Sequence, residues 1–187
     1  MAWTDELPRL LIVPGLNGSG PEHWQTRLEQ SHPRAARVAV PDWSHADLDT
    51  WANAIGQTLA RESAPPPVAR SRVLPADPLA RLRPHDESPR GAAPMWIAVA
   101  HSFGCLALAH YLLRGSVGLD AVLLVAPANP ERFDIPEGLL DRALPVGSTL
   151  VFSRNDPWMT EADARYLGRR WGSELVDAGE AGHINPA

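Results

Sequence analysis

The sequence predicts a three-layer α/β domain, with a mostly parallel central sheet and helices on both of its faces. Apolar runs of strand length alternate with helical stretches almost throughout, which is typical of parallel sheets. Most of these runs stop at Pro, Gly or Asp, as strands do where loops begin. The 187 residues are 44% hydrophobic and 21% charged, as expected of one globular domain. We therefore expect residues 1–187 to form a single domain.

The first half of the chain contains two predicted strands and two predicted helices. Strands are expected at 9–13 (RLLIV) and 37–40 (RVAV), each followed by proline. Helices are expected at 22–30 and 47–61, and in the second of these apolar residues recur at spacings of three and four. That spacing places them on one helical face.

The second half continues the same alternation. Thr160 is a favoured N-cap residue, and with Asp163 it forms a start that resembles a capping box. Strands are predicted at 95–100, 119–126, 148–153 and 173–176, and helices at 103–114 and 160–171.

Between the two halves, residues 63–94 contain eight prolines and five arginines without a convincing period. Pro-rich polar segments are typical of disorder, which is the expectation here, and a lid-like excursion is the alternative.

Charge and cysteine content exclude several classes of protein. The net charge of −5 gives no reason to expect nucleic acid or anionic membrane as a partner. A single cysteine, Cys105, rules out an internal disulfide, and no paired Cys/His pattern predicts a metal site. Neither a signal peptide nor a membrane helix is recognisable. We expect a cytoplasmic protein, a monomer or small homo-oligomer, without a cofactor.

The most informative segment places Ser102 between a strand and a helix. The pattern Ala100-His101-Ser102-Phe103-Gly104 is close to the small-x-Ser-x-Gly of a nucleophile elbow, where a sharp turn exposes the serine hydroxyl. Small residues are needed because strand and helix approach closely there. The alternative is that Ser102 only caps the helix.

Two further residues complete a candidate catalytic triad. Asp156 follows the strand at 148–153, and His183 follows the last short strand. Both would lie at the same sheet edge as Ser102, in the chain order Ser, Asp, His. Histidine suits the role of general base, and a carboxylate would orient it. Singly, Asp156 could be a turn residue before proline and His183 an ordinary tail histidine; jointly, the order favours catalysis.

The loop after the first strand supplies the expected oxyanion hole. One N–H should come from Phe103, which follows the serine, and a second from Leu16 in the glycine-rich loop. The side chain of Asn17 could add a contact to substrate. A phosphate-binding loop is the competing interpretation, but the spacing fits no phosphate-binding motif and the loop has no lysine.

Two more residues are candidates for contacting substrate. His101 flanks the serine and could shape its pocket, and Trp158 follows Asp156 closely enough to line it. Trp24 and Trp43 are further candidates for an apolar acyl pocket. For the other tryptophans considered, the expectation is core packing: Trp51, Trp96 and Trp171.

Several short motifs occur together along the chain: Pro14-Gly15 with Gly18-Ser19-Gly20, Glu22-His23-Trp24-Gln25, the elbow, Asn155-Asp156-Pro157 and Gly182-His183-Ile184-Asn185. Together they resemble one family, the YdeN-like serine hydrolases related to retinoblastoma-binding protein nine. The resemblance covers nearly the whole chain except 63–94.

This resemblance implies an α/β-hydrolase fold with a minimal cap, the triad Ser102, Asp156 and His183, and small esters or amides as substrates. The alternative is a binding or adaptor protein on the same scaffold, because fold does not fix function. The sequence departs from the family in the 63–94 insertion and in ending four residues after His183, where relatives continue into a short helix. Either a truncated chain or a loosely held His183 would follow.

Overall fold

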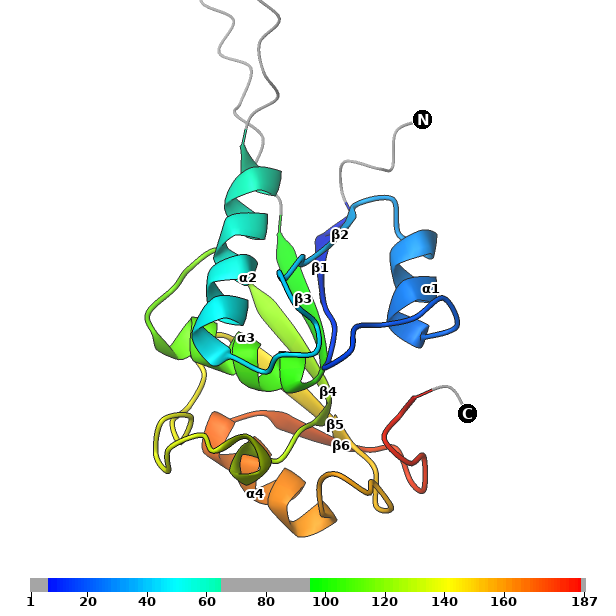
Figure 1. The fold of residues 1–187 in the computed structure, drawn as a ribbon, viewed down its shortest axis with the longest axis vertical. Coiled ribbons are helices and arrows are strands. Elements are labelled where there is room, and N and C mark those ends of the chain that lie inside the picture. The colour runs from blue at the N-terminus through cyan, green and yellow to red at the C-terminus, as the bar shows by residue number, and fades with distance from the viewer. Residues whose placement is uncertain (1–6, 65–94, 186–187) are drawn as a thin grey trace, which may run out of the picture.

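A single sheet of six strands organises the molecule. The computed structural model describes residues 7–64 and 95–185. The strand order is β2-β1-β3-β4-β5-β6, and every neighbouring pair is parallel (Figure 1). Parallel neighbours need long crossover connections, and helices provide most of them. The predicted fold class, α/β with helices on both faces, is confirmed.

The helices and strands follow the predicted alternation, and an additional short 3-10 helix lies between β4 and β5. The strands are β1 Arg9–Val13, β2 Ala35–Arg37, β3 Trp96–Ser102, β4 Ala121–Pro127, β5 Gly147–Phe152 and β6 Glu174–Asp177. The helices are α1 Trp24–Ser31, α2 Leu48–Ser63, α3 Phe103–Leu113, η3 Pro130–Phe133 and α4 Glu161–Trp171.

One strand differs from its prediction. The sequence favours 37–40, whereas β2 pairs with β1 only over Ala35–Arg37. Val38 and Val40 are buried all the same. The N–H of Val38 donates to the Ile12 oxygen of β1 over 2.9 Å, and the pairing ends there although Val40 is also buried. An apolar run alone does not distinguish burial from strand pairing.

The sheet separates two unequal cores. The larger lies between the sheet and helices α2, α3 and α4, and includes the buried tryptophans Trp51 and Trp171. The smaller lies on the other face, where Trp24 and Leu28 of α1 pack against β1 and β3. Figure 1 shows α1 on one side of the sheet and α2 and α3 on the other.

Part of the segment predicted to be an insertion lies outside the described residues. Helix α2 continues to Ser63, so only residues 63 and 64 of the 63–94 segment are described. The expectation of disorder concerns 65–94, which lie outside the described residues. No helix in the described ranges is long and apolar enough to cross a membrane.

Candidate active site

Ser102 occupies a sharp turn at the junction of β3 and α3. Its backbone dihedrals are φ 53° and ψ −125°, a conformation that side-chain-bearing residues rarely adopt. A Cβ added to Gly104 would lie 2.3 Å from the Pro14 oxygen, and one added to Gly15 would lie 2.7 Å from the Ser102 Cβ. Only glycine fits at these two positions, because β1, its loop and the turn are in direct contact.

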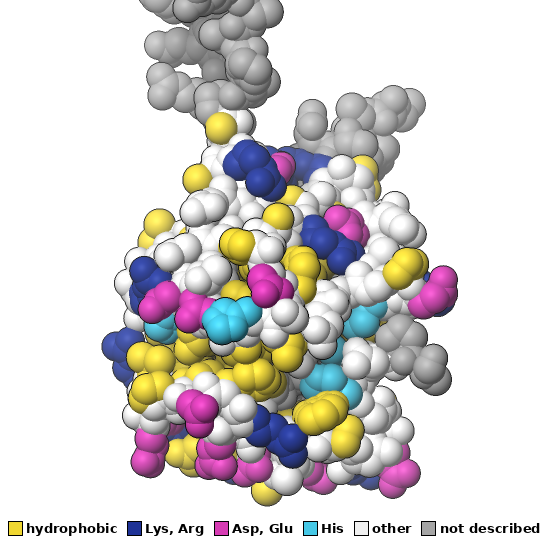
Figure 2. Space-filling model, in the orientation of Figure 1, with side chains coloured by type: hydrophobic (Ala, Val, Ile, Leu, Met, Phe, Trp, Pro, Cys, Tyr) yellow, Lys and Arg dark blue, Asp and Glu magenta, His cyan; other side chains and the backbone are white. Residues whose placement is uncertain are grey.

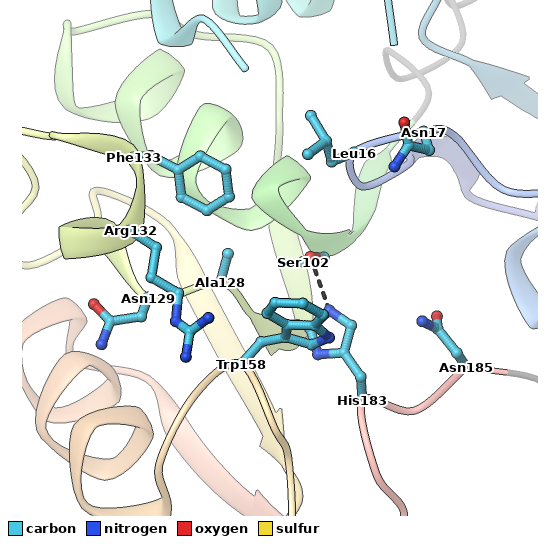
Figure 3. A pocket seen from close by; sticks show the side chains of 10 residues that line it. All are labelled: Leu16, Asn17, Ser102, Ala128, Asn129, Arg132, Phe133, Trp158, His183 and Asn185. Carbon is cyan, nitrogen blue, oxygen red and sulfur yellow. Dashed lines mark hydrogen bonds between the residues drawn. The ribbon is translucent and has the colours of Figure 1, made fainter. Parts of the chain in front are cut away.

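The three predicted triad residues lie in hydrogen-bonding contact. His183 Nε2 is 2.9 Å from Ser102 Oγ (Figure 3). His183 Nδ1 is 2.7 Å from Asp156 Oδ2. They come from the carboxyl ends of β3, β5 and β6, which a parallel sheet brings to one edge. With Nδ1–H donating to the carboxylate, Nε2 is the acceptor that faces the serine hydroxyl.

Asp156 is held so that both of its oxygens are used. Oδ2 accepts from His183, and Oδ1 accepts from the backbone N–H of Trp158 over 2.8 Å. The aspartate side chain is only 2% exposed. A carboxylate so enclosed keeps its orientation, and with it the orientation of the imidazole.

The loop that carries His183 is tied to the loop after β5. Ser153 Oγ accepts from the N–H of Ala181 over 2.9 Å, and Asn155 Oδ1 accepts from the N–H of Gly182 over 2.7 Å. Ser153 also donates to the same Asn155 oxygen. The expectation that His183 is loosely held therefore finds no support in these contacts.

His101 lies behind His183 and not on a cavity wall, which differs from the substrate-contacting role predicted for it. Its Nε2 lies 2.9 Å from the backbone oxygen of His183, and only 4% of the residue is exposed. The pKa of His101 is lowered to about 4, chiefly by burial and also by the neighbouring rings of His183 and His23. A neutral ring with Nε2–H as the donor follows.

His23 makes a similar contact with Asn185, two residues after His183. Its Nδ1 accepts from the backbone N–H of Gln25, which caps helix α1, so Nε2 carries the proton and donates to Asn185 Oδ1 over 3.0 Å. Burial lowers the pKa of His23 as well. The ring centroids of His23 and His101 are 4.9 Å apart, as are those of His101 and His183.

The two predicted oxyanion donors lie beside the serine. Leu16 lines the cavity that contains Ser102, and Phe103 begins α3. The N–H of the next residue, Asn17, donates to the Trp43 oxygen over 2.8 Å, which fixes the loop. The N–H of Leu16 donates to no acceptor in the described part of the chain. An unpaired N–H next to a serine hydroxyl is what an oxyanion hole needs.

A cavity of about 290 Å³ opens above Ser102 and His183. Its apolar wall consists of Leu16, Ala128, Phe133 and Trp158. Figure 2 shows hydrophobic side chains gathered in a band across this face of the molecule, with histidines beside them.

The polar part of the wall includes residues that sequence reasoning missed. Asn17 was a candidate, but Asn129, Arg132 and Asn185 were given no role, and neither was Phe133 on the apolar wall. Asn129 and Arg132 belong to the connection between β4 and β5, where no motif identifies them. Asn185 belongs to a recognised motif and could have been found there.

Of the tryptophans predicted to line an acyl pocket, the structure places one at the cavity and two elsewhere. Trp158 lines the cavity, whereas Trp24 packs edge-on against His101 and Trp43 against Trp51. Trp51, Trp96 and Trp171 are buried, as expected of core residues.

Other reactive side chains are turned away from the cavity. Burial raises the pKa of the Cys105 thiol, which removes it as a nucleophile. Within 7–64 and 95–185, no group of three metal-binding side chains comes together.

Comparison with known proteins identifies the family of the chain. The serine hydrolase family model matches residues 10–74 and 82–187. The crystal structure of a YdeN-like hydrolase from Pectobacterium atrosepticum is 35% identical, with a TM-score of 0.76 over 97% of this chain and 82% of that one. A search of curated proteins gave no significant match.

Two more distant structures share the fold. The ydeN gene product of B. subtilis is 15% identical, with a TM-score of 0.66 over 96% of this chain and 89% of that one. Est1E of Butyrivibrio proteoclasticus, solved with ferulic acid, is 10% identical, with a TM-score of 0.66 over 97% of this chain and 83% of that one. Given the family match over most of its length and the 35% identical relative, the chain belongs to the serine hydrolase family and is a hydrolase with the α/β-hydrolase fold.

Proposed function

We propose that this enzyme cleaves small carboxylic esters or amides through an acyl-enzyme intermediate, with Ser102 as nucleophile, His183 as general base and Asp156 as its orienting carboxylate. The observation that carries the proposal is the continuous hydrogen-bonded line from Ser102 Oγ through His183 to Asp156, with distances of 2.9 and 2.7 Å. Nucleophile, base and orienting group in this order are the parts that acyl transfer requires.

In the first half of the reaction, Ser102 Oγ bonds to the carbonyl carbon while its proton passes to His183 Nε2. The carbonyl oxygen becomes an oxyanion and accepts hydrogen bonds from the N–H groups of Leu16 and Phe103. Collapse of this intermediate breaks the bond to the leaving oxygen or nitrogen, which takes the proton from Nε2. Asp156 stabilises the imidazolium while it exists.

In the second half, a water molecule replaces the leaving group above the acylated Ser102. His183 Nε2 takes a proton from the water as its oxygen bonds to the acyl carbon. As the new tetrahedral intermediate collapses, its bond to Ser102 Oγ breaks, His183 Nε2 returns the proton to that oxygen, and the carboxylic acid leaves. The enzyme is restored, and no cofactor takes part.

The size of the cavity favours short acyl chains. About 290 Å³ lies at the lower end of the range for small-molecule sites, and Trp158 and Phe133 stand on its wall. We expect short-chain esters to be turned over faster than long-chain lipids. A cytoplasmic location and a monomeric or small oligomeric state stay predictions of the sequence.

A panel of p-nitrophenyl esters, from acetate to palmitate, tests the proposal. Wild type should favour the short members, and Asp156→Asn should lower kcat by about 10⁴-fold while KM changes little, because the imidazole loses its orienting charge. A folded wild type without activity on esters or on matched aminoacyl amides would instead favour a binding or adaptor role.

A further inference from the structure

Arg132 brings a positive charge to the cavity that contains the proposed nucleophile. It projects from η3, and Figure 3 shows its side chain beside Trp158 and Asn129. Its guanidinium lies over the Trp158 ring, 5.2 Å from the ring centroid, and Nη2 reaches toward the Pro157 oxygen over 3.5 Å. Both side chains remain exposed, so a substrate entering the cavity can meet them.

This charge has no counter-ion in the described part of the chain. Most arginines there, such as Arg37 and Arg170, pair with a carboxylate, but Arg132 forms no ion pair. Asp156, the acidic residue of the triad, is buried and occupied by His183.

Apart from Ser102 and His183 of the triad, the other polar side chains on the cavity wall are uncharged amides: Asn17, Asn129 and Asn185. The cavity thus has a cationic wall although the whole protein carries a net charge of −5.

From this arrangement we propose that Arg132 is a specificity-determining residue that selects substrates bearing a carboxylate, an inference that rests on the proposed hydrolase function. A guanidinium binds a carboxylate through two parallel hydrogen bonds, and stacking on Trp158 holds its plane ready for this. The small cavity restricts such a substrate to a short chain. The carboxylate can belong to the acyl chain or to the leaving group.

Two matched pairs of esters separate these possibilities. The first compares p-nitrophenyl hydrogen glutarate with p-nitrophenyl valerate, which differ by a terminal carboxylate on the acyl chain. The second compares para-carboxyphenyl butyrate with its para-carbamoyl analogue, which differ on the leaving group. In one of the two pairs, kcat/KM of wild type should be about tenfold higher for the carboxylate-bearing ester than for its neutral partner. This is the difference expected from one charge-assisted hydrogen bond. The preference should weaken with salt.

The substitution Arg132→Gln should abolish that preference, because kcat/KM for the acids should fall about tenfold relative to kcat/KM for the matched neutral esters. Arg132→Lys should retain part of it, because the charge remains but the paired hydrogen bonds do not. Arg142→Gln is the matched control. Arg142 is also exposed, and within the described residues its guanidinium hydrogen-bonds only to the Leu113 oxygen. This substitution changes the net charge equally and should keep the preference. An acid preference that survives Arg132→Gln, or one absent from both pairs, would overturn the proposal.

A binding measurement keeps this test separate from the proposed chemistry. Ligand-observed NMR measures the binding of monomethyl glutarate to Ser102→Ala, which cannot hydrolyse it. The dissociation constant should rise about tenfold in the double variant Ser102→Ala/Arg132→Gln. Inactivity of wild type toward all four esters and toward matched aminoacyl amides would reject the hydrolytic function alone. Equal binding by the two variants would reject the role of Arg132 alone.

Discussion

His101 supports His183 from behind, with Nε2 and the backbone oxygen of His183 2.9 Å apart. Because the oxygen can only accept, the ring must donate, and the low pKa of His101 keeps its other nitrogen unprotonated. His101 thus acts as a positioning residue for the proposed base, although it does not line the cavity.

Replacing His101 should reveal this support. In His101→Phe the ring packing is kept but the donor is lost. We expect kcat to fall about fivefold with KM nearly unchanged, as for one hydrogen bond of about 1 kcal/mol. In His101→Gln an amide N–H takes the place of Nε2–H and should restore most of the rate. Equal losses in the two variants would mean that the packing, and not the hydrogen bond, matters.

The bond between His23 and Asn185 should couple energetically to the same reaction. His23→Asn keeps a good helix cap for α1, but its side chain is too short to reach Asn185. We expect His23→Asn and Asn185→Ala each to lower kcat several-fold, and the double variant to be little worse than either. A coupling energy of about 1 kcal/mol in this double-mutant cycle is the prediction. Strictly additive losses would show that the two side chains act separately.

Stability should fall as the pH drops from about 6.5 toward 4. Burial lowers the pKa of His101 in the folded protein below its value in the unfolded chain. The stability that depends on neutral His101 is therefore fully present above the unfolded-state pKa. It is lost as the pH falls, because the unfolded chain binds the proton first. A drop from 6.5 to about 4 corresponds to about 3 kcal/mol. Lowering of the His23 pKa acts in the same direction.

Urea denaturation at several pH values measures this effect. The free energy of unfolding of His101→Phe should depend less steeply on pH between 6.5 and 4 than that of wild type. Parallel curves for the two proteins would show that His101 does not titrate in this way.

Gly104 should tolerate no side chain. A Cβ there would lie 2.3 Å from the Pro14 oxygen and 2.6 Å from the Val13 oxygen, so the backbone of the elbow or of the oxyanion loop must move. Gly104→Ala should cost about 1–3 kcal/mol in stability and lower kcat about 100-fold, because Ser102 moves relative to its partners.

Gly147→Ala is the control for this change. Gly147 has an ordinary φ, and no atom of residues 7–64 and 95–185 lies within 4 Å of an added Cβ. We therefore expect a change in unfolding free energy below about 0.5 kcal/mol. Thermal melts and ester kinetics of both variants make the comparison. Wild-type activity in Gly104→Ala would contradict the described closeness of the elbow to β1.

The fold could be predicted because its signals are local. Strand-length apolar runs, their terminating residues and the cap at Thr160 each depend on neighbouring residues. Thr160 does cap α4, accepting from the N–H of Asp163 over 3.1 Å. The strand predicted at 37–40 was misplaced because the apolar run continues to Val40, past the point where pairing with β1 ends.

The site was predictable only where chain order and a motif pointed to it. Ser102, Asp156 and His183 follow strands in a recognisable order, and the structure brings them into contact. Arg132 could not be found, because nothing in the sequence shows that the loop after β4 reaches the cavity. His101 belongs to β3, where successive side chains point to opposite faces of the sheet, and its ring packs against Trp24 of α1.

The central claim is that Ser102 is the nucleophile, and labelling with a fluorophosphonate probe tests it most directly. Folded wild type should gain one covalent adduct, located by mass spectrometry on the peptide that contains Ser102, and Ser102→Ala should gain none. Circular dichroism shows whether both proteins are folded. A folded wild type that stays unlabelled, or labelling that persists in Ser102→Ala, would contradict the account.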